Sequence, residues 1–173
     1  GFDAIRSEFR FSKLMARVHK VIEKIEPHDS VERYTELGVD CRQGEARMVS
    51  PWEVEIRNGD STERLTARSI IIATGARPFV PPIPGIDDMD ILTSDNLWEV
   101  QEQPKRLVVL GGGPIGCELA QTFARLGSQV MQVEMLPRIM PREDNDAAAL
   151  VTASLRESGV EVMTEHKAVR FAR

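Results

Sequence analysis

Residues 106–127 read Arg-Leu-Val-Val-Leu-Gly-Gly-Gly-Pro-Ile-Gly-Cys-Glu-Leu-Ala-Gln-Thr-Phe-Ala-Arg-Leu-Gly, and this stretch decides the fold. The apolar run at 106–110 predicts a buried strand, and the three glycines after it predict a tight turn. Apolar residues at helical spacing then predict a helix from about 114 to 126. A strand, a glycine turn and a helix in this order indicate the opening of a parallel α/β unit.

The turn carries the pattern Gly111-x-Gly113-x-x-Gly116, which lets a backbone fold closely against a pyrophosphate at a helix N-terminus. A second predicted strand, residues 129–133, leads to Glu134, about 20 residues past the glycines, where an acceptor for a ribose 2′-hydroxyl is expected. We interpret the segment as a dinucleotide site. The alternative is a turn whose glycines serve only helix–strand packing, which explains Gly116 but leaves Gly111, Gly113 and Glu134 unexplained.

Composition narrows the classes of protein. The net charge of −5 and the lack of a basic block argue against a nucleic-acid-binding surface. No apolar run is long enough to cross a membrane. The two cysteines, Cys41 and Cys117, predict neither a disulfide framework nor a metal site, and a reducing cytoplasm is the expected location.

The first part of the chain predicts a helix and several short strands. Apolar residues three and four apart predict an amphipathic helix over about 8–26. Residues 37–41 predict a short strand. Alternation from Trp52 to Arg57 predicts a half-buried strand, Asn58-Gly59 a hairpin turn, and residues 63–67 the returning strand.

The pattern changes at residues 69–75, Ser-Ile-Ile-Ile-Ala-Thr-Gly, which predict a strand buried in the middle of a layered sheet. The prolines at 78–84 then predict an irregular connection. A helix is expected from 144 or 145 to about 158, followed by a third parallel strand at 160–163. The predicted buried face of that helix comprises Ala147, Leu150, Val151 and Leu155.

Two motifs in series resemble one family of enzymes. Ile-Ile-Ala-Thr-Gly-Ala-Arg-Pro at 71–78 precedes Val-Leu-Gly-Gly-Gly-Pro-Ile-Gly-Cys-Glu-Leu-Ala at 109–120, and a Pro- and Arg-containing stretch follows Glu134. The chain resembles the FAD-dependent pyridine nucleotide-disulfide oxidoreductases, in the branch of dihydrolipoamide dehydrogenase and mercuric reductase. The resemblance implies an α/β fold in which a Rossmann-like βαβ unit with a parallel sheet joins part of an FAD-binding domain that holds an antiparallel β-hairpin.

The resemblance also implies a division of the chain. Residues 1–92 correspond to the C-terminal portion of an FAD-binding domain, 93–103 to a linker, and 104–173 to the N-terminal half of an NAD(P)-binding domain. The chain is therefore expected to be an internal fragment of a homodimeric parent enzyme.

Site residues follow from the same resemblance. Ala73, Thr74 and Gly75 would lie against FAD, and the backbone near Gly44 and Ala46 would meet its adenine. Glu118 matches a glutamate that pairs with a flavin-proximal lysine, which would lie outside this chain. The expected nicotinamide cofactor residues are Gly111, Gly112, Gly113, Pro114, Ile115, Gly116, Glu134 and Arg138.

The implied activity is transfer of a hydride from NAD(P)H to FAD and on to a disulfide or metal-ion acceptor. NADH is favoured because Glu134 would repel a 2′-phosphate, although Arg138 offers a compensating charge for NADP. The redox Cys-x4-Cys pair and the first glycine fingerprint are missing from these residues, and Pro114 stands where some members carry a gating tyrosine. The fragment alone is expected to be inactive.

Two alternatives to that enzyme remain open from the residues. The first is a stand-alone NAD-binding or regulatory module without redox catalysis. The second is a non-catalytic remnant that assembles through its amphipathic helix.

Overall fold

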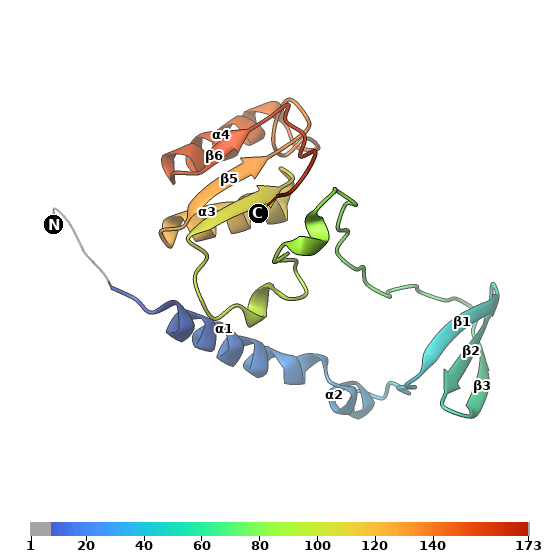
Figure 1. Ribbon diagram of the computed structural model, residues 1–173. Coiled ribbons are helices and arrows are strands. Elements are labelled where there is room, and N and C mark those ends of the chain that lie inside the picture. The colour runs from blue at the N-terminus through green and yellow to red at the C-terminus, as the bar shows by residue number, and fades with distance from the viewer. Residues whose placement is uncertain (1–7, 173) are drawn as a thin grey trace. The chain divides into compact units, whose positions relative to one another are not determined.

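The computed structural model describes residues 8–172, which divide into two compact units (Figure 1). One unit comprises residues 13–77, and the other contains residues 8–12 with 78–172. The first holds a three-stranded antiparallel sheet and the second a three-stranded parallel sheet. The expected α/β fold, with a parallel βαβ unit and a separate antiparallel hairpin element, is confirmed.

The predicted amphipathic helix is α1, Phe11–Ile25. Phe11 and Met15 on its apolar stripe are buried, whereas Val21, Ile22 and Ile25 farther along the same stripe are exposed. A 3₁₀ turn at Glu26–Asp29 follows, with the proline in its first turn. The short helix α2, Val31–Glu36, is capped by the Ser30 hydroxyl, which accepts from the Arg33 amide at 3.2 Å.

The antiparallel sheet is formed by β1 (Glu45–Ser50), β2 (Glu53–Asn58) and β3 (Ser61–Thr66), with β2 in the centre. Asn58 pairs with Ser61 across a two-residue turn in which Gly59 has a φ of 57°. The Asn-Gly signal therefore located the hairpin, since Gly59 supplies the positive φ. The turn residues are Gly59 and Asp60, and the returning strand begins at Ser61, two residues before its predicted start. Strand β1 was not predicted.

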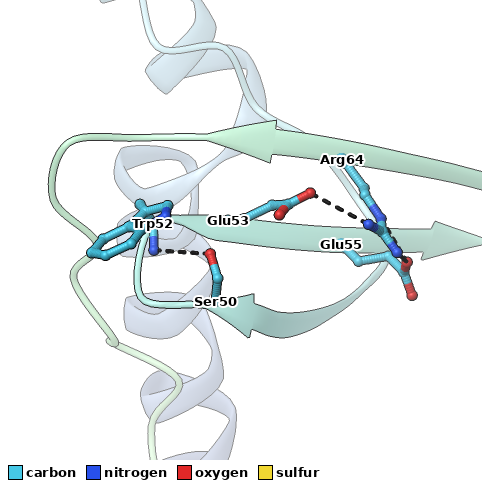
Figure 2. A network of polar contacts seen from close by, with 5 residues as sticks. All are labelled: Ser50, Trp52, Glu53, Glu55 and Arg64. Carbon is cyan, nitrogen blue, oxygen red and sulfur yellow. Dashed lines mark hydrogen bonds and ion pairs between the residues drawn. The ribbon is translucent and has the colours of Figure 1, made fainter.

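One face of this sheet is polar (Figure 2). Arg64 on β3 lies opposite Glu55 on β2, and its Nε donates to the Glu55 carboxylate at 3.1 Å. The same guanidinium reaches Glu53 at 3.5 Å. In the β1–β2 turn the Trp52 amide donates to the Ser50 hydroxyl at 3.3 Å. These cross-strand pairs support the register, although exposed ion pairs of this kind add little stability.

Two predicted strands were wrong. Residues 37–41 form no strand, because Leu37 closes α2 and Gly38 turns the chain with a φ of 86°. Residues 69–75 form no helix or strand, and the side chains of Ile71 and Ile72 are 90% and 67% exposed. A strand that is apolar on both faces needs neighbouring strands and covering layers, and no strand among residues 8–172 pairs with it.

The second unit follows the predicted order closely. Its elements are β4 (Arg106–Leu110), α3 (Pro114–Arg125), β5 (Gln129–Val133), α4 (Asn145–Glu157) and β6 (Glu161–Met163). The strands run parallel in the order β4-β5-β6, and the three arrows point the same way in Figure 1. Short 3₁₀ turns at Ile86–Asp88 and Leu97–Glu99 precede β4.

The core of this unit lies where α3 and α4 meet the sheet. Its buried side chains include Ala120, Phe123, Val130, Leu155 and Val160. The rings of Phe123 and Phe11 are 6.2 Å apart, within the range of favourable aromatic pairs.

Helix α4 departs from prediction at two positions, because Ala147 and Leu150 of the predicted buried face are both exposed. Leu155 is 1% exposed and Ala148 2%, but Leu150 is 74% exposed. At about 100° per residue, Leu150 lies about 140° around the helix from Leu155, whereas Ala148 and Val151 lie close to it in projection. The buried stripe therefore excludes Leu150.

These two leucines give a matched test of the core. We expect Leu155→Ala to lower the free energy of unfolding by about 2–5 kcal/mol, because it opens a cavity in a packed site. Leu150→Ala removes the same atoms at a solvent-exposed position and should change the free energy of unfolding by less than about 0.5 kcal/mol. Denaturant unfolding of both variants measures the difference, and equal losses would show that the assigned helix face is wrong.

Candidate functional site

The glycine turn, residues 111–113, connects β4 to α3 in the second unit. Gly111 has a φ of 102°, and its amide donates to the Val133 carbonyl at 2.8 Å, which carries the β4–β5 ladder one residue past the strand. Gly113 is the N-cap of α3, and Pro114 occupies the first turn. The proline suits this position because an amide there would have no intrahelical acceptor.

The glycines of this region are needed for different reasons. A Cβ at Gly116 would lie 2.6 Å from the Gly111 carbonyl oxygen, and one at Gly112 would lie 2.8 Å from the Ile139 side chain. Gly111 is needed for its positive φ. Gly113 has an ordinary φ of −74°, and a Cβ there would meet nothing within 4 Å. Packing and backbone strain thus explain every glycine except Gly113.

Free backbone donors lie beside Gly113. The amides of Ile115 and Gly116 are in the first turn of α3, where a helix offers them no acceptor. Within residues 8–172, neither these amides nor that of Gly113 donates to a protein acceptor. The positive end of the helix dipole adds to these donors, so the position suits an anion.

Glu134 follows β5 directly, as predicted, and its carboxylate turns toward the glycine turn. Oε2 accepts from the Gly112 amide at 2.6 Å and Oε1 from the Leu136 amide at 2.8 Å. The residue is only 9% exposed. Each carboxylate oxygen has a second lone pair, so Glu134 retains acceptor capacity at the edge of the turn.

Arg138 lies in the loop after Glu134, but its guanidinium is occupied. One terminal nitrogen donates to the Met140 carbonyl at 2.8 Å and the other to the Pro141 carbonyl at 2.9 Å. The structure therefore places all the predicted nicotinamide cofactor residues around one turn, with Arg138 bound to its own loop.

A mainly apolar hollow of about 550 Å³ lies along β4 and reaches the glycine turn. It is lined on one side by Leu107–Leu110 and Pro114–Gly116 and on the other by Pro78–Pro81 and Ile91–Ser94. Since its walls are apolar, it contributes shape beside the turn, while the charge-binding groups are the backbone amides.

Comparison with known families gives a match over residues 5–173 to the pyridine nucleotide-disulphide oxidoreductases. The chain belongs to this family. The family match covers both units and agrees with the motifs at 71–78 and 109–120.

The relatives that are similar to the chain include mercuric reductases and dihydrolipoyl dehydrogenases. The mercuric reductase of Bacillus cereus is 32% identical over 95% of this chain and 25% of its own length. The dihydrolipoyl dehydrogenase of Thermus scotoductus is 42% identical over 77% of this chain and 28% of its own length. The chain thus spans about a quarter of the length of these oxidoreductases.

Two solved structures are similar to the chain over almost its whole length. The Cu(II) complex of the HOCl-induced flavoprotein disulfide reductase RclA from Escherichia coli has a TM-score of 0.77 at 29% identity, covering 94% of this chain and 37% of that one. LpdA from Mycobacterium tuberculosis has a TM-score of 0.76 at 27% identity, covering 95% and 37%.

In this disulphide oxidoreductase chain, the predicted FAD-lining residues lie in the unit of residues 13–77. Gly44 precedes β1 with a φ of 152°, and a Cβ there would lie 2.6 Å from the Arg57 carbonyl oxygen. Close approach to β2 therefore already requires this glycine. Ala46 is exposed on β1, and residues 73–75 are exposed in the extended segment after Ile72.

Two other predicted positions lie on α3. Pro114 and Glu118 are both exposed. Glu118 makes no ion pair with any residue from 8 to 172, and its carbonyl accepts from the Thr122 hydroxyl at 2.7 Å.

Sequence reasoning missed a buried polar contact beneath the turn. Gln132 on β5 is 0% exposed, and its Nε2 donates to the Gly111 carbonyl at 3.0 Å. Its Oε1 is buried and has no hydrogen-bond partner within the described chain. A glutamine inside a buried parallel strand was the available signal, because such a strand is usually apolar throughout. Ile139, also 0% exposed, was missed because loop residues are rarely buried.

Residues 8–172 contain no group of three or more His, Cys, Asp or Glu residues that could hold a metal ion. No helix in this range is long and apolar enough to cross a membrane.

Cys117 is buried next to Gln132, and this burial raises the pKa of its thiol. Because the thiolate is the reactive form, we expect Cys117 to resist iodoacetamide at about pH 8, with the half-buried Cys41 modified at least about tenfold faster. Timed alkylation followed by peptide mass spectrometry measures both rates. Denatured protein, in which both thiols should react alike, is the control, and equal rates in the folded chain would contradict the assigned burial.

Proposed function

We propose that this chain is part of a flavoprotein that passes a hydride from NAD(P)H to FAD and on to a disulfide or metal-ion acceptor. Membership of the oxidoreductase family supports the reaction class. The acceptors suggested are those of the dihydrolipoyl dehydrogenases and mercuric reductases to which the chain is similar.

The main support for a nicotinamide cofactor site is the open space at Gly113. The missing side chain of Gly113 serves neither packing nor backbone geometry, and it keeps space open beside the free amides of α3. A pyrophosphate needs this close approach of backbone to ligand. The residues therefore fit a dinucleotide, and the space beside Gly113 supports this proposal over the packing-only alternative.

The chain's own residues have distinct tasks in this proposal. The amides of Gly113, Ile115 and Gly116 bind the pyrophosphate, and Glu134 accepts from the ribose. The chemistry comes from the bound cofactors, since nicotinamide carries the hydride and flavin accepts it. The protein contributes binding and orientation, and Glu134 makes NADH the favoured reductant because its carboxylate opposes a 2′-phosphate.

The unit of residues 13–77 is proposed to contribute to the FAD site through Gly44, Ala46 and residues 73–75. On this proposal residues 1–92 belong to an FAD-binding domain, 93–103 to a linker and 104–173 to an NAD(P)-binding domain, in a cytoplasmic homodimer. The polypeptide alone is proposed to be inactive, because Cys41 and Cys117 lie far apart in sequence and supply no adjacent redox pair.

Anaerobic titration of the intact protein with NADH tests the proposal. We expect NADH to change the visible absorption of bound FAD with a stoichiometric end point, because the hydride reaches the flavin before any further acceptor. Saturable NADH binding by a protein that holds no FAD would instead favour a stand-alone nucleotide-binding module.

Gly113 and Gly112 provide a matched test of the nicotinamide site. We expect Gly113→Ala to raise the KM for NADH about tenfold or more, because the methyl group enters the pyrophosphate space, at a stability cost below about 1 kcal/mol. Gly112→Ala should lower the free energy of unfolding by about 1–3 kcal/mol, because its Cβ overlaps Ile139. Steady-state kinetics and thermal unfolding separate the two effects. An unchanged KM in Gly113→Ala would remove the assignment.

Removing the charge of Glu134 tests its proposed role in cofactor preference. Glu134→Gln should raise the ratio of kcat/KM for NADPH to that for NADH about tenfold, because it removes like-charge repulsion of the 2′-phosphate. The absolute KM for NADH should also rise, since an amide has one acceptor oxygen for two backbone amides. The exposed Glu157→Gln on α4 is the charge-matched control. A constant ratio would show that Glu134 does not discriminate.

A further inference from the structure

The loop after β5, residues 134–141, folds back onto the glycine turn. It contacts Gly112 from three directions: through the Glu134 carboxylate, the Ile139 side chain and the Met140 amide. We call residues 134–141 the bracing loop.

Both polar groups of Gly112 are bound by this loop. Its amide donates to Glu134 Oε2 at 2.6 Å, and its carbonyl accepts from the Met140 amide at 2.6 Å. Gly112 therefore has no free group for a ligand, and its peptide planes are fixed. Because Gly113 follows directly, fixing Gly112 also fixes the donors that face the anion position.

Met140 reaches Gly112 only in an unusual conformation. Its φ is 50°, in the left-handed region that a residue with a side chain occupies at a cost. Such a conformation persists when its surroundings hold it. Ile139, fully buried against Gly112, anchors it on one side.

Arg138 holds Met140 on the other side. Its two terminal nitrogens bind the carbonyls of Met140 and Pro141, at 2.8 and 2.9 Å, so the planar guanidinium spans the bend of the loop. A fork of two charge-assisted hydrogen bonds fixes geometry in a way that a single ammonium cannot. The Met140 carbonyl also accepts from the Glu143 amide at 3.1 Å, which closes the bend.

We propose that Arg138 is a positioning residue of the nicotinamide site, which acts through Met140 and Gly112, and is not a ligand of the 2′-phosphate. The proposal rests on the proposed function of the glycine turn. In this proposal Glu134 discriminates between NADH and NADPH, whereas Arg138 supports the affinity for both cofactors equally. Arg138 in its clamped position leaves the 2′-phosphate without this cation as a partner.

The test uses Arg138→Met in the intact flavoenzyme, with KM and kcat measured for NADH and for NADPH. We expect both KM values to rise by the same factor, about tenfold, with the ratio between the cofactors unchanged within about twofold and kcat little altered. Arg142→Met is the matched control, because Arg142 is an exposed arginine four residues away, and it should change neither cofactor. Glu134→Gln shows that the assay detects a changed ratio.

Three outcomes would overturn the proposal. A KM that rises for NADPH alone would make Arg138 a phosphate ligand. Unchanged KM values for both cofactors would remove any role at this site. A fall in kcat with both KM values unchanged would place its effect on a later step.

Two further measurements keep the result clear. Hydrogen exchange of the Met140 amide should accelerate in Arg138→Met without any cofactor, and unchanged exchange would contradict the clamp even if the wild-type protein failed to oxidise NADH. If the wild-type protein does not oxidise NADH but exchange of the Met140 amide accelerates in Arg138→Met, the proposed function is rejected. The role of Arg138 in holding the bracing loop is then retained. If Arg138→Met does not accumulate folded, Arg138→Lys decides: it should raise both KM values equally, whereas a phosphate ligand would tolerate the retained charge.

Discussion

The first turn of α3 lies very close to the end of β4, where Gly116 lies against the Gly111 carbonyl. No side chain fits between them, because even a Cβ would lie 2.6 Å from that oxygen. This approach brings the helix N-terminus next to the carboxyl end of the strand, with its unpaired amides facing outward. The anion position, the placement of Glu134 beside Gly112 and the return of the bracing loop all depend on it.

Around this contact the chain uses buried polar groups in place of a larger apolar core. Gln132 binds the Gly111 carbonyl from below, and Glu134 and Met140 bind the two sides of Gly112. A turn of three glycines has high conformational freedom when unfolded, so each of these hydrogen bonds restricts residues that would otherwise be the least defined in the unit.

The sequence predicted the second unit well because its signals are local. The bounds of β4 and β5 were predicted correctly, since apolar runs, a glycine turn and helical spacing all lie within one βαβ segment. The positions of Glu134 and the glycines followed from the same spacing. The role of Arg138 could not be predicted from the sequence, because tertiary contacts set the direction of a long side chain in a loop. Here those contacts are with the carbonyls of Met140 and Pro141.

Residues 69–75 show the opposite case. Three isoleucines in a row were interpreted as a central strand, yet Ile71 is 90% exposed, because a strand is completed by partners distant in sequence. Strand β4 likewise pairs with β5 alone among the described residues, and Val108 on it is 53% exposed. Exposed apolar strands of this kind are surfaces that further strands or layers would cover. The contacts that shape the glycine turn lie between residues 110 and 141, so the proposed nicotinamide site is built within one segment of this chain. The proposed flavin-lining residues 73–75, in contrast, are exposed and form no strand with any of residues 8–172.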